Sequence, residues 1–372
     1  MLTSLLGIRL VLWLGSVIPL PAPVNVSSAL SGVEVTNDAE SGDGFQMTFT
    51  LAKEKGLEYG LLLGGSLAPF TRVVLGVVHG AVPEVLIDGV ITHHQLAPSN
   101  EPGQSTLTVT GRDISVMLDL EEKNEKYENQ PDSVIFTRIV AGYAQYGLVP
   151  QPSATTDIPI MLYRIPRQHE TDLRFIQRMA RRNGFVFYIE PVSFGVNRAY
   201  FGPESRLGLP QPALSMNMGA STNVRSLSFS QDALAPVGSS GGIVEPFTKM
   251  RIPIPPLPSL KIPPLASAPI PARRTRLLRD TANQNPTQGA ATLVAAATNA
   301  PDAVTGDGEL DTVRYGAVLR ARKLVGVRGA GLSYDGNYYV SRVTHVISRG
   351  AYTQRFTLRR EGVGSLVPVV RP

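Results

Sequence analysis

The sequence predicts an α+β protein in which β-strands dominate. Only 17% of its 372 residues are charged and 43% are hydrophobic, and it contains 35 Gly and 30 Pro, a composition typical of many short strands separated by turns. Apolar and polar residues alternate along many segments, whereas helical periodicity is concentrated in the middle of the chain. The length allows two or three domains, each large enough to bury its own core.

Residues 5–20 form an apolar stretch that is compatible with a signal peptide or with a buried strand. Arg9 interrupts this stretch, no Lys or Arg precedes it, and no A-x-A-like cleavage site follows. It is also shorter than the roughly 20 apolar residues of a membrane-spanning helix. We therefore expect a strand that stays on the mature protein. Its two faces would carry Leu10, Leu12 and Leu14 on one side and Val11 and Trp13 on the other.

Residues 32–111 are predicted to form a small barrel or sandwich of short antiparallel strands. The second strand alternates clearly, because Phe45, Met47, Phe49 and Leu51 fall on one face. Gly, Pro and Asp residues mark turns between the segments. The expected strands cover residues 32–36, 45–51, 71–79, 85–96 and 105–110.

The character of the chain changes near Gly111, where two helices and a strand predict an α+β domain. The first helix is expected to begin with Asp132 or Ser133 as its cap and to end at Tyr146, before Gly147. The second is expected to begin near Thr171, to end at Asn183–Gly184, and to lead into a strand over residues 185–190. Its apolar stripe consists of Leu173, Ile176, Met179 and Ala180.

β character returns after Pro203, and a proline-rich segment then interrupts it. Nine of the 30 residues between Ile243 and Ala272 are proline, which predicts polyproline II or an extended loop along a surface. A short helix is expected over residues 288–299.

The last 60 residues contain a clear hairpin, with strands at 338–347 and 352–359 around the turn Arg349–Gly350. In its second strand two sets of residues alternate, so one face is expected to be buried and the other to meet water or a partner. The first set is Tyr352, Gln354, Phe356 and Leu358, and the second is Thr353, Arg355, Thr357 and Arg359.

The net charge of +5 is unevenly distributed. Residues 31–132 contain 16 acidic and 6 basic residues, a net charge of −10, and residues 133–372 contain 14 acidic and 28 basic residues, a net charge of +14. Such a division can guide head-to-tail contact between copies of one chain, although ordinary surface variation gives the same pattern. The basic residues match no nucleic-acid-binding motif, so no nucleic-acid partner is expected.

We find no pattern for a catalytic, cofactor-binding or metal site. The absence of Cys removes disulfides, thiolate ligands and cysteine nucleophiles together. His93 and His94 are adjacent on an expected strand and therefore point to opposite faces. No HExxH, P-loop, GxGxxG or GxSxG pattern occurs in its required setting, and the pair Glu121–Glu122 is typical of a solvated face rather than of a glycosidase site.

The helix–strand segment Glu170–Glu190 follows Gly111–Asp113, Tyr127–Ser133 and Tyr146–Leu148 along the chain, and Tyr338–Val340, His345 and Tyr352–Arg360 come near its end. In their order and spacing, over residues 24–362, these segments together resemble the family of phage late control D proteins and VgrG-type baseplate hubs. No single segment decides the resemblance.

This resemblance implies a homotrimer in which each chain has two small antiparallel β-barrels with an α+β domain inserted between them. Three chains would then form a tube-like ring of six barrels and adapt a sixfold inner tube to a threefold spike. Carried onto this chain, it implies a first barrel at residues 5–111, the α+β domain at 112–205, a second barrel at 206–232 plus 313–365, and a Pro-rich insertion with a short helix at 233–312.

The implied role is that of a structural, non-enzymatic baseplate hub of a contractile phage tail or related injection system, with no cofactor. Its partners would be other copies of itself, an inner tube protein, a separate spike protein and other baseplate components. Assembly would take place in the cytoplasm and the chain would not span a membrane. VgrG-type spikes continue into an OB-like domain and a β-helix needle, so the end at Pro372 leads us to expect the needle on another polypeptide. Two other functions stay open, a spike-associated cell-wall hydrolase and a monomeric β-type protein that binds nucleic acid or carbohydrate.

Overall fold

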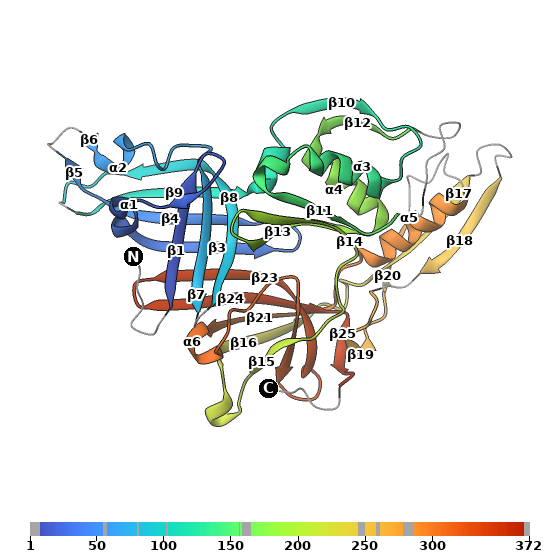
Figure 1. Cartoon of the computed structure of the whole chain (residues 1–372). Coiled ribbons are helices and arrows are strands. Elements are labelled where there is room, and N and C mark those ends of the chain that lie inside the picture. The colour runs from blue at the N-terminus through green and yellow to red at the C-terminus, as the bar shows by residue number, and fades with distance from the viewer. Residues whose placement is uncertain are drawn as a thin grey trace.

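A 13-stranded, mainly antiparallel sheet forms the frame of the protein (Figure 1). The computed structural model describes residues 8–54, 58–79, 82–101, 103–155, 157, 165–244, 250–257, 261–277 and 286–367. Two six-stranded parts of the large sheet, which we call unit 1 and unit 2, lie next to each other, and an α+β domain and an insertion lie to one side of them.

Unit 1 contains the strands that alternation predicted in the first part of the chain. They pair in the order β3-β4-β9-β8-β7-β1. Phe45, Met47, Phe49 and Leu51 are all buried in one core, as predicted. Leu10, Leu12 and Leu14 on β1 are buried as well, while Val11 and Trp13 on the other face are half-buried, which confirms the expected N-terminal strand. The strands are β1 (Arg9–Gly15), β3 (Leu30–Asp38), β4 (Gly44–Leu51), β7 (Arg72–His79), β8 (Val82–Ala97) and β9 (Ser105–Asp113), with the smaller elements β2 (Leu20–Pro21), α1 (Val24–Ala29), β5 (Lys53–Glu54), β6 (Glu58–Tyr59) and α2 (Gly60–Leu63).

The α+β domain has its own apolar core, built from both helices and the strands beside them. The domain pairs β10 with β12 and forms a second sheet of order β11-β14-β13. Its elements are the 3-10 turn η1 (Ile114–Leu118), β10 (Glu122–Lys126), α3 (Asp132–Ala141), the 3-10 turn η2 (Ala144–Tyr146), β11 (Leu148–Pro152), β12 (Arg167–Thr171), α4 (Asp172–Asn183), β13 (Val186–Ser193) and β14 (Val196–Gly202).

Helix α4 agrees with its prediction, and α3 requires two corrections. Thr171 caps α4 by accepting a hydrogen bond from the Arg174 N–H, and Gly184 ends the helix in the left-handed conformation. Helix α3 ends at Ala141 rather than at Tyr146, because Gly142 caps it. Asp132 is not the cap either. It lies in the first turn, where its carboxylate binds Arg182 of α4.

Unit 2 contains the predicted C-terminal hairpin and pairs its strands in the order β16-β21-β24-β23-β22-β15. Tyr352, Gln354, Phe356 and Leu358 are buried on β24, and the residues between them are exposed or half-buried, as expected. The elements are β15 (Gln211–Ser215), the 3-10 turn η3 (Gly219–Ser221), β16 (Val224–Gln231), β21 (Val304–Asp311), α6 (Thr312–Tyr315), β22 (Leu324–Arg328), β23 (Gly336–Ser348), β24 (Ala351–Arg360) and β25 (Gly362–Ser365).

The Pro-rich insertion is more ordered than the sequence predicted. Strand β18 (Arg251–Leu257) pairs with β17 (Val237–Val244) at the edge of a three-stranded sheet completed by β20 (Arg274–Leu277), so this part is strand rather than polyproline II or loop. An edge strand tolerates proline because only one of its sides must supply N–H donors. β19 (Ala266–Pro269) pairs with β25, and the expected helix forms as α5 (Pro286–Thr298). The predicted boundary after residue 312 falls beyond β21, which pairs with β16 and β24 of unit 2.

Unit 1 and unit 2 repeat one topology. Strands β1, β3, β4, β7, β8 and β9 correspond in chain order to β15, β16, β21, β22, β23 and β24, and each set is arranged in the same spatial order. A short helix also follows the third strand of each set, α2 in unit 1 and α6 in unit 2. The outermost pairing differs in direction, being antiparallel for β1–β7 and parallel for β15–β22.

The register of pairing repeats as well. The β3–β4 pair shifts register after Leu30, and the β16–β21 pair shifts after the corresponding Val224. A second shift occurs in the β8–β9 pair and in the β23–β24 pair. Thr92 of β8 and Ser341 of β23 are the extra residues there, with no residue opposite them on the next strand. The hydroxyl of each extra residue donates to a carbonyl on the next strand, Thr92 to Thr110 and Ser341 to Thr357. Irregularities of this kind interrupt a ladder locally, so their recurrence aligns the two units residue by residue.

A backbone feature outside the strands confirms this alignment. Phe70 and Arg322 precede β7 and β22 by two residues, and both have a positive φ, of 65° and 64°. Phe70 N–H donates to Ile91 O, and Arg322 N–H donates to Val340 O at the corresponding position of β23. Positive φ is uncommon for bulky residues, so two such residues at matching positions indicate one conserved local geometry in both units.

Candidate functional surface

The two units are joined edge to edge by β3 and β23, a junction that we call the seam. The strands pair antiparallel over seven residue pairs, from Arg342 opposite Asp38 to Ser348 opposite Gly32. At its centre the hydroxyl oxygens of Thr36 and Thr344 lie 3.1 Å apart. The pairing makes one continuous sheet out of the two units (Figure 1).

Ion pairs reinforce one end of the seam. Arg342 Nε lies 2.5 Å from Asp38 Oδ2. Although burial alone raises the pKa of Asp38, the backbone N–H groups of Glu40 and Ser41 and the Arg342 guanidinium hold this pKa below its usual value. Asp38 is therefore a stable anion beside its partner across the seam.

Arg322 connects three parts of the molecule at the same end of the seam. Its guanidinium donates to the Asp43 carboxylate of unit 1 over 3.0 Å, and to the Asp38 carbonyl over 2.6 Å. The guanidinium also stacks 4.4 Å from the ring centre of Tyr188, which belongs to the α+β domain. These contacts link unit 2, from which Arg322 comes, to both other parts.

The buried side of the seam is filled by His345 and its neighbours. The Nδ1 atom of His345 lies 2.7 Å from the Tyr352 hydroxyl, and its Nε2 atom lies 3.1 Å from the Asn37 side-chain oxygen of unit 1. Complete burial, with a smaller contribution from Arg320, lowers the pKa of His345 to about 3. The ring is therefore neutral at physiological pH and acts as a packed, hydrogen-bonded element of the core.

The opposite side of the continuous sheet, which we call the polar face, carries small hydroxyl residues and charges. Strand alternation produces this composition, because the residues between them point into the apolar cores. Its exposed or half-buried members are Thr36, Gln46, Thr48, His93, Gln95, Thr108, Thr110, Ser226, Ser228, Asp307, Glu309, Arg342, Thr344, Arg355 and Thr357.

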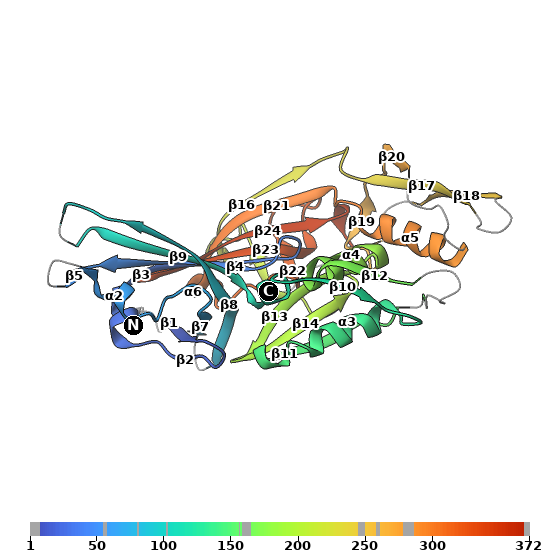
Figure 2. The same ribbon diagram turned by 90° about the horizontal axis from the view of Figure 1, so that it is seen from above.

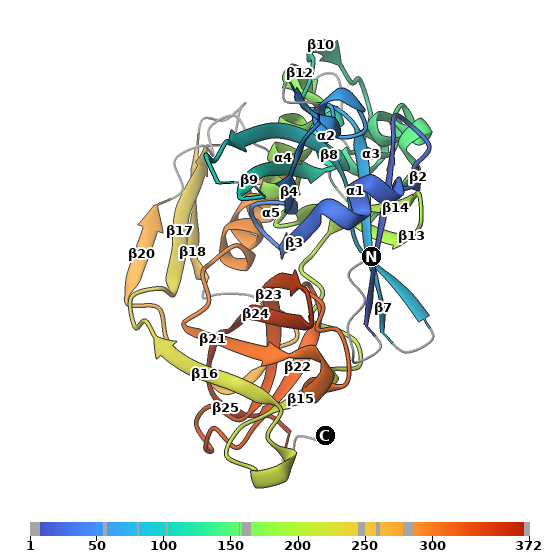
Figure 3. The same cartoon turned by 90° about the vertical axis from the view of Figure 1, so that its left-hand side faces the viewer.

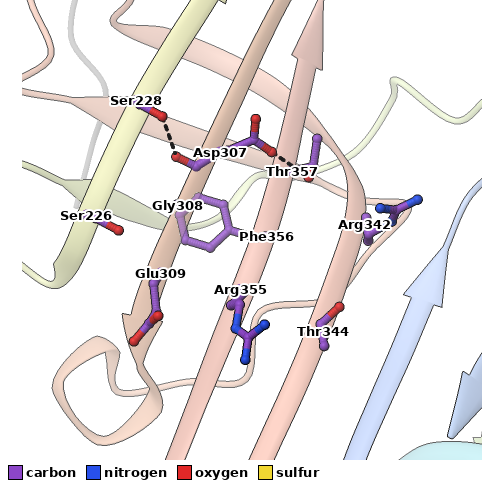
Figure 4. Close-up of a pocket in the computed structure, with 10 residues that line it drawn as sticks. All are labelled: Ser226, Ser228, Asp307, Gly308, Glu309, Arg342, Thr344, Arg355, Phe356 and Thr357. Carbon is purple, nitrogen blue, oxygen red and sulfur yellow. Dashed lines mark hydrogen bonds between the residues drawn. The ribbon is translucent and has the colours of Figure 1, made fainter.

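The polar face is hollowed over unit 2, where a cavity of about 460 Å³ lies above β16, β21, β24 and β23 (Figure 4). Thr357 donates a hydrogen bond of 2.7 Å to Asp307 at its floor. Arg355 and Arg342 line the cavity together with Asp307 and Glu309, so both signs of charge are present. Apart from Gly308 and Phe356, the lining is polar.

Comparison with solved structures reveals proteins of the same architecture. The "tail protein from Neisseria meningitidis MC58" matches with a TM-score of 0.62 and 13% identity over 96% of this chain and 98% of that chain. The "prophage MuSo2, 43 kDa tail protein from Shewanella oneidensis" matches with a TM-score of 0.61 and 13% identity, over 95% and 98% of the two chains. This chain shares their fold.

A third matching structure is described as part of a secretion system. The E. coli c3393 protein, described as a component of the type VI secretion system with structural similarity to T4 bacteriophage tail proteins gp27 and gp5, has a TM-score of 0.56 and 14% identity. The match covers 92% of this chain and 77% of that one. No protein-family model matches the sequence, and a search of curated proteins finds no match.

The sequence-based expectations about sites concern mainly the histidines. His93 is exposed on the polar face, and its neighbour His94 on the opposite face of β8 is half-buried. Across the described ranges, no group of three or more His, Asp or Glu side chains could hold a metal ion. In the same ranges no helix is long and apolar enough to cross a membrane.

Sequence reasoning missed the seam. Its residues are more than 300 positions apart, as in the Thr36–Thr344 contact, and no local pattern announces such a pairing. One signal was present, since the hairpin strand 338–347 alternates in the same way as the strand after Leu30. Alternation identifies strands, however, and does not say which strands pair.

Proposed function

We propose that this chain is the structural hub of a contractile phage tail-like injection system, in which three copies adapt a sixfold inner tube to a threefold spike. The role is structural rather than enzymatic. The observation that carries the proposal is the repeat of six strands in one order and one register within a single chain.

A repeated unit explains how one chain can serve two symmetries. Three chains contain three α+β domains and three insertions but six copies of the six-stranded unit, so a threefold ring presents six nearly equivalent elements to a tube. The seam supports this arrangement, because it joins two units side by side in one sheet, as neighbours around a ring must be joined.

The polar face supports the proposal at the level of chemistry. A channel wall needs a continuous surface without large apolar patches, on which a passing chain finds no strong attachment. Threonines over both units, and serines and charges of both signs over unit 2, meet this requirement. We propose that the polar face lines the lumen of the ring.

The fold shared with tail proteins supports the partners that this role needs. We propose an inner tube protein, a separate spike protein and other baseplate components as partners, with assembly in the cytoplasm before the particle is complete. In domain terms we propose a first β-barrel at residues 5–111, the α+β domain at 112–205, and a second barrel at 206–232 that resumes with β21 rather than at residue 313.

Mass measurement on the purified chain tests the proposal. Light scattering coupled to size exclusion should give about 120 kDa, three times the chain mass of 40.0 kDa. Negative-stain class averages of the same fraction should show a ring with six similar lobes around a central hole. A monomer at every concentration, or a stable dimer, would contradict the hub role.

A further inference from the structure

Two strand edges correspond to the two sides of the seam, and neither has a partner strand among the described residues; we call them the unfilled halves. In the repeated topology β16 is the counterpart of β3, and β8 is the counterpart of β23. Among the described residues β16 has a neighbouring strand on one side only, β21, and residues 92–97 of β8 pair only with β9. Strand β16 forms the outer edge of unit 2 (Figure 3), and the β8–β9 end lies far from the insertion strands β17 and β18 (Figure 2).

Burial distinguishes the filled seam from the two unfilled halves. Val343 and His345 on β23 are completely buried, whereas their counterparts on β8 are the half-buried His94 and Leu96, which is 41% exposed. Ser226, Ser228 and Ser230 on β16 are exposed. Long unprotected strand edges readily take up another strand, and natural proteins usually block them.

We infer that β16 of one copy pairs antiparallel with residues 92–97 of β8 in the next copy, in the register of the seam. This inference rests on the proposed trimeric hub and specifies its interface. We apply the residue pairing of the seam to the corresponding residues of β16 and β8. This places Asp232 opposite His93, Ser230 opposite Gln95 and Phe229 opposite Leu96. The partner is a second copy of this chain.

Asp232 makes one of the backbone hydrogen bonds that Asp38 makes in the seam. The Oδ1 atom of Asp38 accepts a hydrogen bond of 2.7 Å from the N–H two residues later, that of Glu40, and its Oδ2 atom binds Arg342. The Oδ1 atom of Asp232 accepts one of 2.8 Å from the N–H of Leu234 in the same way. Within the described ranges its other oxygen has no ion-pair partner, and the inferred register brings His93 of the next copy to that position.

A second polar atom near the open edge is also without a partner. The Nε2 atom of His94 is buried and has no hydrogen-bond partner among the described residues. Unsatisfied buried groups are rare in native proteins, because each loses its hydration without compensation. In the inferred register the exposed Gln231 of the next copy lies opposite His94 and can supply the missing hydrogen bond.

The main chain of β16 is oriented for this pairing. Asp232 N–H points inward and donates 2.9 Å to Ala303 O, so the N–H of the preceding residue, Gln231, points outward. In the filled seam Ala39 N–H donates across to Ser341 O, and the corresponding alternation makes Asn37, the counterpart of Gln231, a cross-seam donor. The outward N–H of Gln231 therefore corresponds to the cross-seam N–H of Asn37 in the filled seam.

The use of one kind of seam both within and between chains also allows the chains to form a closed ring. Equal seams turn each unit by an equal step, and a step of about 60° closes the ring after six units, which are three chains. The inferred contact brings unit 1, from the region of net charge −10, against unit 2 of the next copy, from the region of +14. Long-range attraction then favours this head-to-tail approach over head-to-head contact.

Disulfide cross-linking tests the register directly, because the chain contains no cysteine of its own. Opposite residues in neighbouring antiparallel strands are about 4.5–5.5 Å apart, within the range a disulfide spans. The variant Q95C/S230C should form covalently linked trimers on mild oxidation. T36C/T344C is the matched positive control and should close within one chain. Q95C/S226C, displaced along the strand by about 13 Å, should give no link.

A proline variant tests the same pairing without a covalent bond. Q231P removes the outward N–H and leaves the bonds to β21 in place, so it should be monomeric at concentrations where the wild type is trimeric. Q231A loses the amide but keeps the N–H and should stay largely trimeric. Monomeric Q231P should melt at the temperature of wild type diluted to its monomer, which confirms that the variant folds. A trimeric Q231P would overturn the interface. So would a trimer in which T36C/T344C cross-links and Q95C/S230C does not. Either result would leave the hub role intact. Absence of both trimer and cross-link would overturn both.

Discussion

At the scale of single residues, His345 shows how the seam uses a titratable side chain for packing. Its two ring nitrogens contact Tyr352 and Asn37, so the neutral ring holds both units together. Burial lowers its pKa to about 3, whereas an unfolded chain has a histidine pKa of about 6.5. Between these values the unfolded state binds a proton that the folded state excludes, and the free energy of unfolding therefore falls as the pH falls.

The corresponding prediction compares the wild type with H345Q. At pH 7 the wild type should be the more stable protein, since glutamine cannot reproduce both contacts. Because a shift of one pKa unit corresponds to about 1.4 kcal/mol and the unfolded histidine is half protonated at pH 6.5, the difference should shrink by about 1.6 kcal/mol between pH 6.5 and pH 5. Urea denaturation over this range measures it, and the carboxyl groups common to both proteins cancel in the comparison. A difference that does not change with pH would contradict this role of His345.

At the scale of elements, α4 shows which features can be predicted from sequence. Its cap Thr171, its apolar stripe and its terminating Gly184 are all local, and each lies where it was expected. Strand β21 was missed for the opposite reason. Its sequence, Val304–Asp311, carries glycine and acidic residues where β-formers are expected.

The glycines of β21 have a physical cause that the sequence does not reveal. A Cβ at Gly306 would lie 2.7 Å from the Phe229 ring, and one at Gly308 would lie 2.5 Å from the Phe356 ring. The aromatic rings of the neighbouring strands take the space that side chains on β21 would fill. The polar face was predictable on β24 from its alternation, but its continuation across the seam depends on tertiary pairing.

Gly184 also determines how the insertion packs, which gives a second prediction. Its φ is +68°, and a Cβ there would lie 2.8 Å from the Ala295 Cα of α5. G184A should therefore carry the left-handed penalty of roughly 1–2 kcal/mol and a further overpacking cost of about 1–3 kcal/mol. G195A is the matched control, since Gly195 has a φ of +72° and open space around it. Chemical denaturation should show a larger loss of stability for G184A than for G195A. Equal losses in the two variants would mean that α5 moves aside without an energetic cost.

At the scale of the whole molecule, charge and buried surface have separate effects on assembly. Exposed charges interact over no more than about 8–10 Å at ordinary salt, so the regions of −10 and +14 act mainly on the encounter of two copies. In the proposed ring, paired strands and packed apolar groups hold the chains together. The two contributions can therefore be separated by ionic strength.

We predict that the trimer forms faster at low salt and persists at moderate salt. Time-resolved light scattering after dilution from a dissociating condition measures the rate, and size exclusion at each salt concentration measures the final mass. The rate should fall as salt rises from about 50 to 500 mM while the final mass stays trimeric. Dissociation at moderate salt would show that charge, rather than buried surface, stabilises the ring.

The seam lies within one chain, and this has a consequence for mass action. Six separate units would have to meet to form a ring of six, and its equilibrium yield would vary with the sixth power of their concentration. Two units on one polypeptide form the Thr36–Thr344 contact at an effective concentration set by the chain itself, independent of dilution. In the proposed trimer only three molecules then need to meet, so the yield of the ring varies with the third power of the chain concentration.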